Sequence, residues 1–346
     1  MGLSTESVMT AETTVPPQET ARSAPSRAPS RSPAASPDEA AVVITGIVGR
    51  LGKRLARKLH RDRKVIGLDR RPFDGCPKDI EHHQIDIRRK KTRDIFRTTP
   101  IAAVVHLGVM HDPRTSAAEH HLWNVIGFQK VLEYVAQYSI PKLVLLSSAN
   151  VYGPRPENAQ FLTEDAPLLG GAAFSEIRDL VEIDMLAQSF FWKRPETETV
   201  ILRPVHIVGT VRNAPSNYLR LPVVPTLLGF DPMMQLIHED DVVRAIELSL
   251  QPGMRGIFNV AGPPPVPLSH VIKAAGRPSL PIPHPLARSM LSPLWRLRVA
   301  SFPAPELDHI RYVCMVDDRR ARETMSYAPT RSLEDAVKAV DEDRWP

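Results

Sequence analysis

The feature that most constrains the fold is a short apolar run that leads directly into three evenly spaced glycines. Residues 41–45 read AVVIT, a composition typical of a buried strand. Residues 46–52 read GIVGRLG, and a helical pattern follows over 50–60. A strand, a glycine turn and a helix in this order are the first units of a parallel α/β sheet.

Strand and helix patterns continue to alternate after this loop. The alternation predicts a Rossmann-type, doubly wound parallel sheet with helices on both faces. The expected strands are residues 64–68, a strand that includes Ile85, and residues 101–107, 142–146 and 199–202. The expected helices are residues 116–138, 174–192 and 241–250, and 286–299 is a candidate helix in a proline-punctuated stretch.

The glycine loop has the layout of a dinucleotide-binding site. Gly46 would permit the tight turn, Gly49 would let the backbone approach a pyrophosphate, and Gly52 would allow the helix to pack closely on the sheet. Asp69 ends the second expected strand, 17 residues after Gly52, where a carboxylate can bind an adenosine ribose. A merely structural turn is the alternative interpretation.

The residues after the second strand bear on the choice of cofactor. The Asp69 carboxylate would repel the 2′-phosphate of NADP, so NAD is favoured. NADP stays an alternative, because Arg70 and Arg71 could hold that phosphate if the carboxylate turned aside.

Composition and pattern divide the chain into three parts. Residues 1–40 are rich in Ser, Thr, Pro, Ala and Glu and cannot bury enough apolar surface to offset their ordering entropy, so we expect a disordered tail. Residues 41–210 are the expected NAD(P)-binding Rossmann domain. Residues 211–346 are expected to form mainly a smaller, C-terminal substrate-binding cap, with returns to the sheet.

Several classes of protein are excluded by composition. No run approaches the roughly 20 apolar residues of a membrane span. The two cysteines, Cys76 and Cys314, cannot form a disulfide framework, and reduced thiols without a secretory signal predict a cytoplasmic protein. The chain has a net charge of +5, and its basic residues are concentrated at 50–64 and 88–93. No aromatic residues that could stack on bases are interleaved there, so no nucleic-acid partner is expected.

From Val42 to Val340 the chain resembles the extended short-chain dehydrogenase/reductases, specifically the NAD-dependent epimerase/dehydratase family that includes UDP-glucose 4-epimerase. The matching segments are DI at 86–87, VVHLG at 104–108, NVIG at 124–127, LLSSANVYG at 145–153, LRPVHIVG at 202–209, HEDDV at 238–242 and residues 317–333. The resemblance implies a Rossmann fold, an NAD cofactor, and a homodimer formed through the helices at 116–138 and 174–192.

The resemblance also implies a set of cofactor contacts besides the glycines and Asp69. Asp86 and Ile87 match the pair that contacts adenine, and Asn124 matches the family's NVxG helix motif. The other expected cofactor contacts are Arg50, Leu51, Arg70, Leu107, Gly108, Ser147 and Arg178. No metal ligands are expected, since His120 and His121 are adjacent on a helix and therefore face different ways.

The family's catalytic motif is incomplete in this chain. Ser148 stands at the catalytic Ser/Thr position, and the family carries Tyr-x-x-x-Lys about 25 residues later. There the tyrosinate removes the hydroxyl proton as hydride passes to nicotinamide, while the lysine lowers the tyrosine pKa and binds the ribose. Phe174 stands for the tyrosine and Arg178 for the lysine. Arginine can bind a ribose, but phenylalanine has no proton to exchange.

Two functions of different classes follow from these residues. In the first, the chain is an oxidoreductase or epimerase acting on a nucleotide sugar or another hydroxyl or carbonyl substrate. Proton transfer is then reassigned to His206, to Glu176 or to a water held by Ser148. In the second, it is a non-catalytic NAD(P)-binding sensor or scaffold. We favour the enzyme, because the cofactor loop, Asn124 and Ser148 persist.

Overall fold

A computed structural model describes Gly2 and residues 40–110, 115–172, 175–287, 289 and 304–342. Apart from Gly2 and Ala40, the tail expected to be disordered lies outside these residues, as does most of the candidate helix at 286–299. No helix within the described ranges combines the length and apolar character needed to cross a bilayer.

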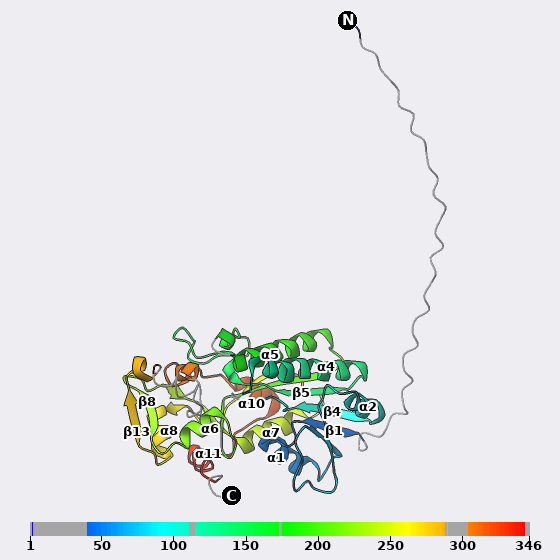
Figure 1. Ribbon diagram of the computed structural model, residues 1–346, viewed down its shortest axis with the longest axis horizontal. Coiled ribbons are helices and arrows are strands. Elements are labelled where there is room, and N and C mark those ends of the chain that lie inside the picture. The colour runs from blue at the N-terminus through cyan, green and yellow to red at the C-terminus, as the bar shows by residue number, and fades with distance from the viewer. Residues whose placement is uncertain are drawn as a thin grey trace, which may run out of the picture. The chain divides into compact units, whose positions relative to one another are not determined.

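The core is a seven-stranded parallel sheet in the order β11-β6-β5-β4-β1-β2-β3 (Figure 1). The strands are β1 Ala41–Thr45, β2 Val65–Asp69, β3 Ile80–Gln84, β4 Ile101–His106, β5 Lys142–Leu146, β6 Glu198–Pro204 and β11 Gly256–Val260. Strand order reverses at β1, between β2 and β4. Ligands of such sheets bind at this switch point, outside the carboxyl ends of the strands. The predicted Rossmann fold is confirmed.

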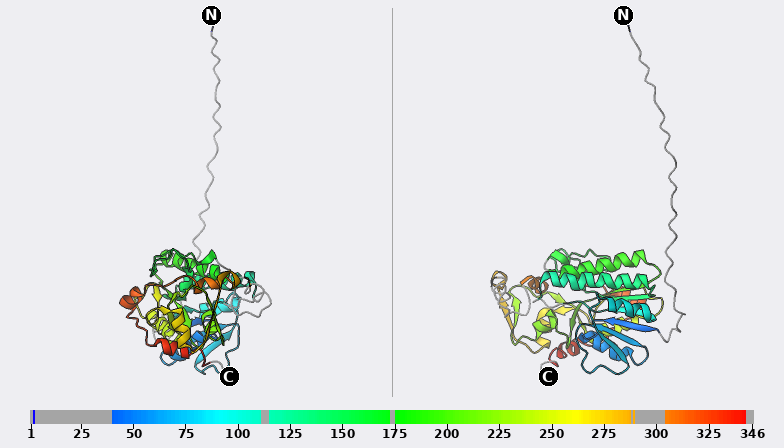
Figure 2. Two further views of the ribbon diagram at one scale, coloured as in Figure 1. Left: turned by 90° about the vertical axis from the view of Figure 1, so that its left-hand side faces the viewer. Right: turned by 45° about the vertical axis from the view of Figure 1, so that its right-hand side comes forward.

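Helices cover both faces of the sheet, as Figures 1 and 2 show. On one face, α1 Arg50–Leu59, α7 Glu239–Ser249 and α10 Arg319–Met325 pack over one apolar cluster. On the other, α2 Lys90–Thr98, α4 Gly127–Gln137 and α5 Ser175–Lys193 pack over a second cluster. Alternate residues of each strand supply the two clusters, since successive side chains point to opposite faces.

Two elements differ from the sequence-based prediction. The expected helix at 116–138 consists of α3 Ala117–His121, a π turn η1 Leu122–Ile126, and α4. A π turn contains one more residue than a turn of α-helix. This single extra residue changes the spacing of the apolar residues too little to be recognised in the sequence. Ile85 follows the third strand instead of lying in it, although its amide still donates to the Asp69 carbonyl at 2.7 Å.

The cap has its own apolar cluster and short paired strands. Its strand pairs are β7 His206–Val208 with β10 Leu236–His238, β8 Val224–Leu227 with β13 Ser279–Ile282, and β9 Met233–Met234 with β12 Val266–Pro267. Its helices include α6 Ala214–Leu219, α8 Leu268–Ala274 and α11 Leu333–Lys338. Between these segments the chain returns to the main sheet, where β11 pairs with β6.

Candidate cofactor and substrate site

The glycine loop follows β1 at the switch point of the sheet. Gly46 has φ +73°, and a Cβ there would lie 2.7 Å from the Cα of Gly108, so the loop and the segment after β4 touch backbone to backbone. A Cβ at Gly52 would lie 2.5 Å from the carbonyl oxygen of Gly46. Only glycine at these positions lets α1 begin so close to the strand ends.

The N-terminus of α1 offers backbone donors to an anion. Gly49 is the N-cap residue and has no side chain to cap the helix, and the first turn of α1, which is described throughout, contains no acidic residue. A Cβ at Gly49 would meet only the Gly46 carbonyl oxygen at 3.1 Å and the far end of Arg71 at 4.0 Å. Arg50 and Leu51 form the half-buried start of the helix. These residues fit a pyrophosphate, which binds to free amides at a helix N-terminus.

Asp69 ends β2 and holds the glycine loop. Its Oδ2 accepts a hydrogen bond from the Val48 amide at 3.1 Å, and both carboxylate oxygens accept bonds from the Arg71 guanidinium at 3.1 Å. Burial raises the pKa of the Asp69 carboxyl, but the hydrogen bonds and charge of Arg71 outweigh burial and lower the pKa. A ribose at Asp69 has to displace Arg71, whose side chain is 62% exposed and free to move into solvent.

A stack of two arginines on a tryptophan lies beside the expected adenine contacts. The Arg70 guanidinium carbon is 3.4 Å from the centroid of the Trp123 ring, and that of Arg88 is 4.3 Å away. Arg88 also forms an ion pair of 2.6 Å with Asp86, the residue expected to contact adenine, while Ile87 packs in the core. Sequence reasoning missed Trp123 and Arg88, although an aromatic residue directly before Asn124 was a signal for a base-stacking surface.

Asn124 is buried and fastens the segment that follows β4. Its Nδ2 donates to the Met110 carbonyl at 3.1 Å, and its Oδ1 accepts from the Met110 amide at 2.7 Å. Leu107 lies in the same segment and donates its amide to the Thr45 carbonyl. Asn124 therefore positions the strand end around Gly108 and has its amide group engaged by protein backbone.

The two serines after β5 have different surroundings. Ser148 caps the short turn η2 Ala149–Val151 by accepting a hydrogen bond from the Asn150 amide at 3.1 Å, and its hydroxyl proton can still be donated. Ser147, expected to contact the cofactor, instead donates to Asp184 at 2.6 Å in the core. Asp184 also accepts two hydrogen bonds from Arg203, at 2.9 and 2.7 Å. The hydroxyl of Ser147 is thus used inside the fold.

The start of α5 carries the positions that are expected to depart from the family motif. Phe174 lies outside the described residues, and so does the side chain of Glu176. Arg178 is described and exposed, and a Cβ on Gly171 would lie 3.4 Å from its Cα. The structure therefore places Arg178 on α5 close to the turn that leads into this helix.

A pocket that is partly open to solvent lies between these segments and the cap, with about 700 Å³ of empty space when the solvent at its opening is included. One wall contains Asn150 and Ile177, which are sequence neighbours of Ser148 and Arg178, together with His206. The rest of the lining comes from the cap and is mainly apolar: Ala214, Pro215, Tyr218, Leu219, Met234, Leu236, Leu268, Val271, His309 and Ile310.

Two histidines face each other in this pocket. The rings of His206 and His309 meet edge to face with centroids 5.4 Å apart, and neither Nδ1 atom has a hydrogen-bond partner within the described ranges. Burial lowers the pKa of His206 to about 4, and burial together with the nearby His206 lowers that of His309 to about 3. Both imidazoles are therefore neutral at pH 7 and can accept or donate a hydrogen bond. Sequence reasoning missed His309, which only the fold brings to His206.

The fold, the glycine loop and the acid at the end of β2 define a dinucleotide-binding protein of the Rossmann class. A family model described as the NAD dependent epimerase/dehydratase family matches residues 42–261, and the chain belongs to this family. The family expected from the sequence is confirmed, and its name agrees with the prediction of NAD as the cofactor.

Similar proteins include both unassigned and named members. An uncharacterized protein of Mycobacterium tuberculosis (strain ATCC 25618 / H37Rv) is 30% identical over 257 residues, which cover 70% of this chain and 67% of that protein. UDP-glucose 4-epimerase of Dictyostelium discoideum is 29% identical over 175 residues, 47% of this chain and 50% of the relative. The structure of UDP-glucose 4-epimerase from Thermotoga maritima with UDP-glucose has a TM-score of 0.68 and 18% identity, covering 88% of this chain and 98% of that one. At this identity the structural likeness shows a common fold.

Proposed function

We propose that the chain is an NAD-dependent oxidoreductase or epimerase that acts on a hydroxyl or carbonyl group of a small molecule bound between the Rossmann sheet and the cap. The observation that carries this proposal is the composition of the pocket wall. Asn150 and Ile177 line the pocket, and they are sequence neighbours of Ser148 and Arg178. These two residues stand at motif positions that, in the family, lie beside the site of hydride transfer. A substrate in the pocket would lie at the carboxyl edge of the sheet, where such folds bind their ligands.

The cofactor half of the proposal rests on the loop and on Asp69. The glycine loop and the amides of α1 would hold the pyrophosphate, and Asp69 would bind the adenosine ribose once Arg71 has moved aside. When bound, NAD supplies the hydride acceptor. Arg178 would contact the ribose on the nicotinamide side.

The lining of the pocket favours a substrate with an apolar body. A nucleotide sugar carries a charged diphosphate, yet none of the described residues that line the pocket is an arginine or a lysine. Desolvating that charge without a cationic partner would be costly. A nucleotide sugar is kept as a second candidate because UDP-glucose 4-epimerase is among the similar proteins.

His206 is the group that we propose for proton transfer. His206 lines the pocket, and its buried Nδ1, unpaired within the described ranges, would accept a hydrogen bond from a substrate hydroxyl after the ring rotates toward the pocket. With a pKa of about 4, however, His206 is a weak base at neutral pH. Positioned acid–base catalysis contributes roughly 10²–10⁴-fold, so turnover should be slower than in an enzyme with an ionisable tyrosine.

A non-catalytic NAD(P)-binding sensor or scaffold is the alternative. Two observations favour it: phenylalanine stands at position 174, and both pocket histidines hold their protons too weakly to titrate near neutral pH. In this alternative the pocket binds a ligand whose occupancy depends on the cofactor.

One experiment separates these functions. NAD and NADH binding to the purified full-length chain is measured by calorimetry, and NADH absorbance is then followed with two panels, apolar secondary alcohols and ketones, and nucleotide sugars. Slow turnover in the first panel is expected, and turnover of nucleotide sugars alone would select the second substrate class. Cofactor binding without turnover in either panel would support the sensor. Absence of NAD binding would contradict all three.

The expected homodimer is a further part of the proposal. Figures 1 and 2 show α4 and α5 side by side over one face of the sheet. Met185 and Trp192, seven residues apart on one face of α5, are 58% and 76% exposed, and large exposed apolar side chains of this kind mark association surfaces. Light scattering should show a dimer for the native chain and weaker association for Trp192→Ser, and a native monomer would refute this part.

We also propose a cytoplasmic location, supported by the free thiols of Cys76 and Cys314.

A further inference from the structure

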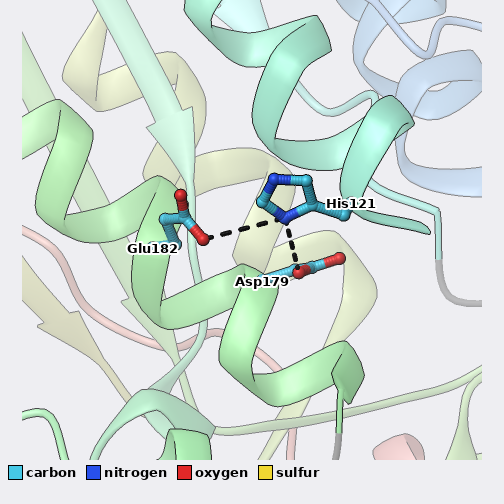
Figure 3. A group of neighbouring side chains, drawn as sticks. All are labelled: His121, Asp179 and Glu182. Atoms are coloured by element: carbon cyan, nitrogen blue, oxygen red, sulfur yellow. Dashed lines mark hydrogen bonds and ion pairs between the residues drawn. The ribbon is translucent and has the colours of Figure 1, made fainter. Parts of the chain in front are cut away.

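A histidine and two carboxylates converge at a place that neither the cofactor loop nor the pocket includes. His121 ends α3, and Asp179 and Glu182 lie on α5 (Figure 3). One nitrogen or oxygen atom from each of the three residues lies within 4.8 Å of the others. The Nδ1 atom of His121 is 3.4 Å from Oδ1 of Asp179 and 3.8 Å from Oε2 of Glu182.

The helices place these three side chains where they could all bind the same metal ion. Asp179 and Glu182 are three residues apart, so both project from the same side of α5, and Figure 3 shows them directed toward the His121 ring on α3. Two ligands of one tetrahedral zinc ion, bonded at about 2.0–2.1 Å, lie roughly 3.3 Å apart. The two separations from His121, 3.4 and 3.8 Å, are close to this value, and all three ligand atoms lie within 4.8 Å of one another, so side-chain movements would bring them around one ion.

Asp179 provides a second, independent observation. The residue is 1% exposed, and its Oδ2 has no hydrogen-bond partner within the described part of the chain. Among the described residues, the hydrogen-bond partner of its Oδ1 is His121, at a distance of 3.4 Å that is long for a hydrogen bond. A buried carboxylate with an unpaired oxygen is costly, and a cation bound at this carboxylate would offset its charge.

Two surface histidine–carboxylate pairs among the described residues differ from the cluster in two ways. His60 and Asp79 are 2.7 Å apart, and His83 and Glu81 are 2.8 Å apart, as expected for direct hydrogen bonds. In both pairs the carboxylate is largely exposed, at 57% and 48%. His238 and Asp240 are 3.5 Å apart, but the Asp240 side chain is 27% exposed. The buried carboxylate of Asp179, and not the spacing alone, therefore distinguishes the cluster around His121.

We propose that His121, Asp179 and Glu182 bind a divalent transition-metal ion, for which Zn²⁺ is the best match. One imidazole nitrogen and two carboxylate oxygens form a ligand set typical of zinc, and three protein ligands leave a coordination position for water. The side chains of His121 and Glu182 are 46% and 44% exposed in the single chain, so the ion can enter from solvent before the proposed dimer forms on the same face of α5. The bound ion fixes α3 against α5 at the residue that directly follows Arg178.

The test uses the tag-free, full-length protein after removal of metals with a chelator. Zn²⁺ is titrated by calorimetry, and Co²⁺ is titrated while its visible absorption spectrum is recorded. The native chain is expected to bind one Zn²⁺ with a concentration-dependent rise of the Tm. Asp179→Asn and His121→Gln should each lower Zn²⁺ affinity by about 100-fold or more, because each removes a ligand. The matched control is His83→Gln, which removes a histidine paired with one carboxylate and should keep native affinity.

Three results would overturn the proposal. The first is a native chain that binds Zn²⁺ no more tightly than Asp179→Asn does. The second is a Co²⁺ spectrum that His121→Gln leaves unchanged. The third is an equal loss of Zn²⁺ affinity in His83→Gln. Circular dichroism establishes that each variant is folded, and His121→Gln, which alters a partly exposed side chain, carries the test if Asp179→Asn does not fold.

Discussion

Replacing Asp69 and Arg71 separately tests how the chain chooses its cofactor. In the structure the Asp69 carboxylate accepts hydrogen bonds from the Arg71 side chain and from the Val48 amide. If NAD binds as proposed, a ribose hydroxyl replaces Arg71 as the donor to this carboxylate. The two variants should therefore change NAD affinity in opposite directions.

The magnitudes follow from the exposure of the two groups. A hydrogen bond to a charged group contributes about 1.5–3 kcal/mol, so Asp69→Ala should weaken NAD binding by about 10- to 150-fold. The Arg71 side chain is 62% exposed, and an ion pair at such a site contributes about 0–1 kcal/mol. Removing this competitor in Arg71→Ala should strengthen NAD binding by up to about fivefold.

Calorimetric titration of NAD and NADP into the native chain and both variants provides the measurement. The native chain should prefer NAD, and Asp69→Ala should narrow the gap between the two cofactors, because the repulsion of the 2′-phosphate is removed. A native preference for NADP would refute the reasoning and would make Arg70 and Arg71 the residues that select the cofactor. Weaker NAD binding by Arg71→Ala would show that Arg71 contacts the cofactor and does not compete with it.

Four further predictions concern the pocket and the core. His206→Ala should weaken substrate binding or turnover while NAD affinity stays unchanged, and unchanged behaviour in both assays would assign His206 a packing role. Since burial lowers the pKa of His206 from 6.5 to about 4, the unfolded chain gains a proton below pH 6.5 that the folded chain does not, and stability should fall by about 3 kcal/mol between pH 6.5 and 4. Urea unfolding should show a smaller fall in His206→Gln, and an identical pH dependence would contradict the buried, neutral state. Phe174→Tyr combined with Arg178→Lys should raise hydride exchange with bound NAD if the native chain lacks only its proton donor, whereas a native enzyme with a relocated base should gain little. Asp184→Ala leaves the fully buried Arg203 without its counter-ion and should lower the free energy of unfolding by about 3–5 kcal/mol, and a loss below about 1 kcal/mol in denaturant unfolding would be inconsistent with a buried pair.

The sheet and the cofactor loop were predictable from the sequence because their signals are local. Apolar runs mark the central strands, and the three glycines and Asp69 lie within two consecutive units of the chain. The structure places these residues around one point, as the spacing indicated. Whether a residue near a strand end, such as Ile85, belongs to the strand depends on its pairing with the neighbouring strand. The composition of a single segment does not show this pairing.

The parts that could not be predicted arise where distant segments meet. Trp123 contacts Arg70 and Arg88 from a π turn, and helical periodicity does not distinguish such a turn from an α-helix. His206 and His309 are separated by most of the cap in sequence. Adjacent histidines such as His121 do not indicate a metal site, because the carboxylates that complete the cluster come from α5.

Helix α5 carries Arg178, and side chains further along the helix hold it against its neighbours. Asp184 anchors this helix to β6 through Arg203, and Asp179 faces α3 through His121, so two contacts on different sides fix the position of α5. Neither contact involves the residue before the helix, where the family carries its tyrosine, or Arg178. Neither contact is removed when Phe174 and Arg178 are replaced. We therefore expect the Phe174→Tyr, Arg178→Lys chain to keep the circular dichroism spectrum and Tm of the native chain, and a change of activity with both unchanged would be assigned to the new side chains and not to a displaced helix.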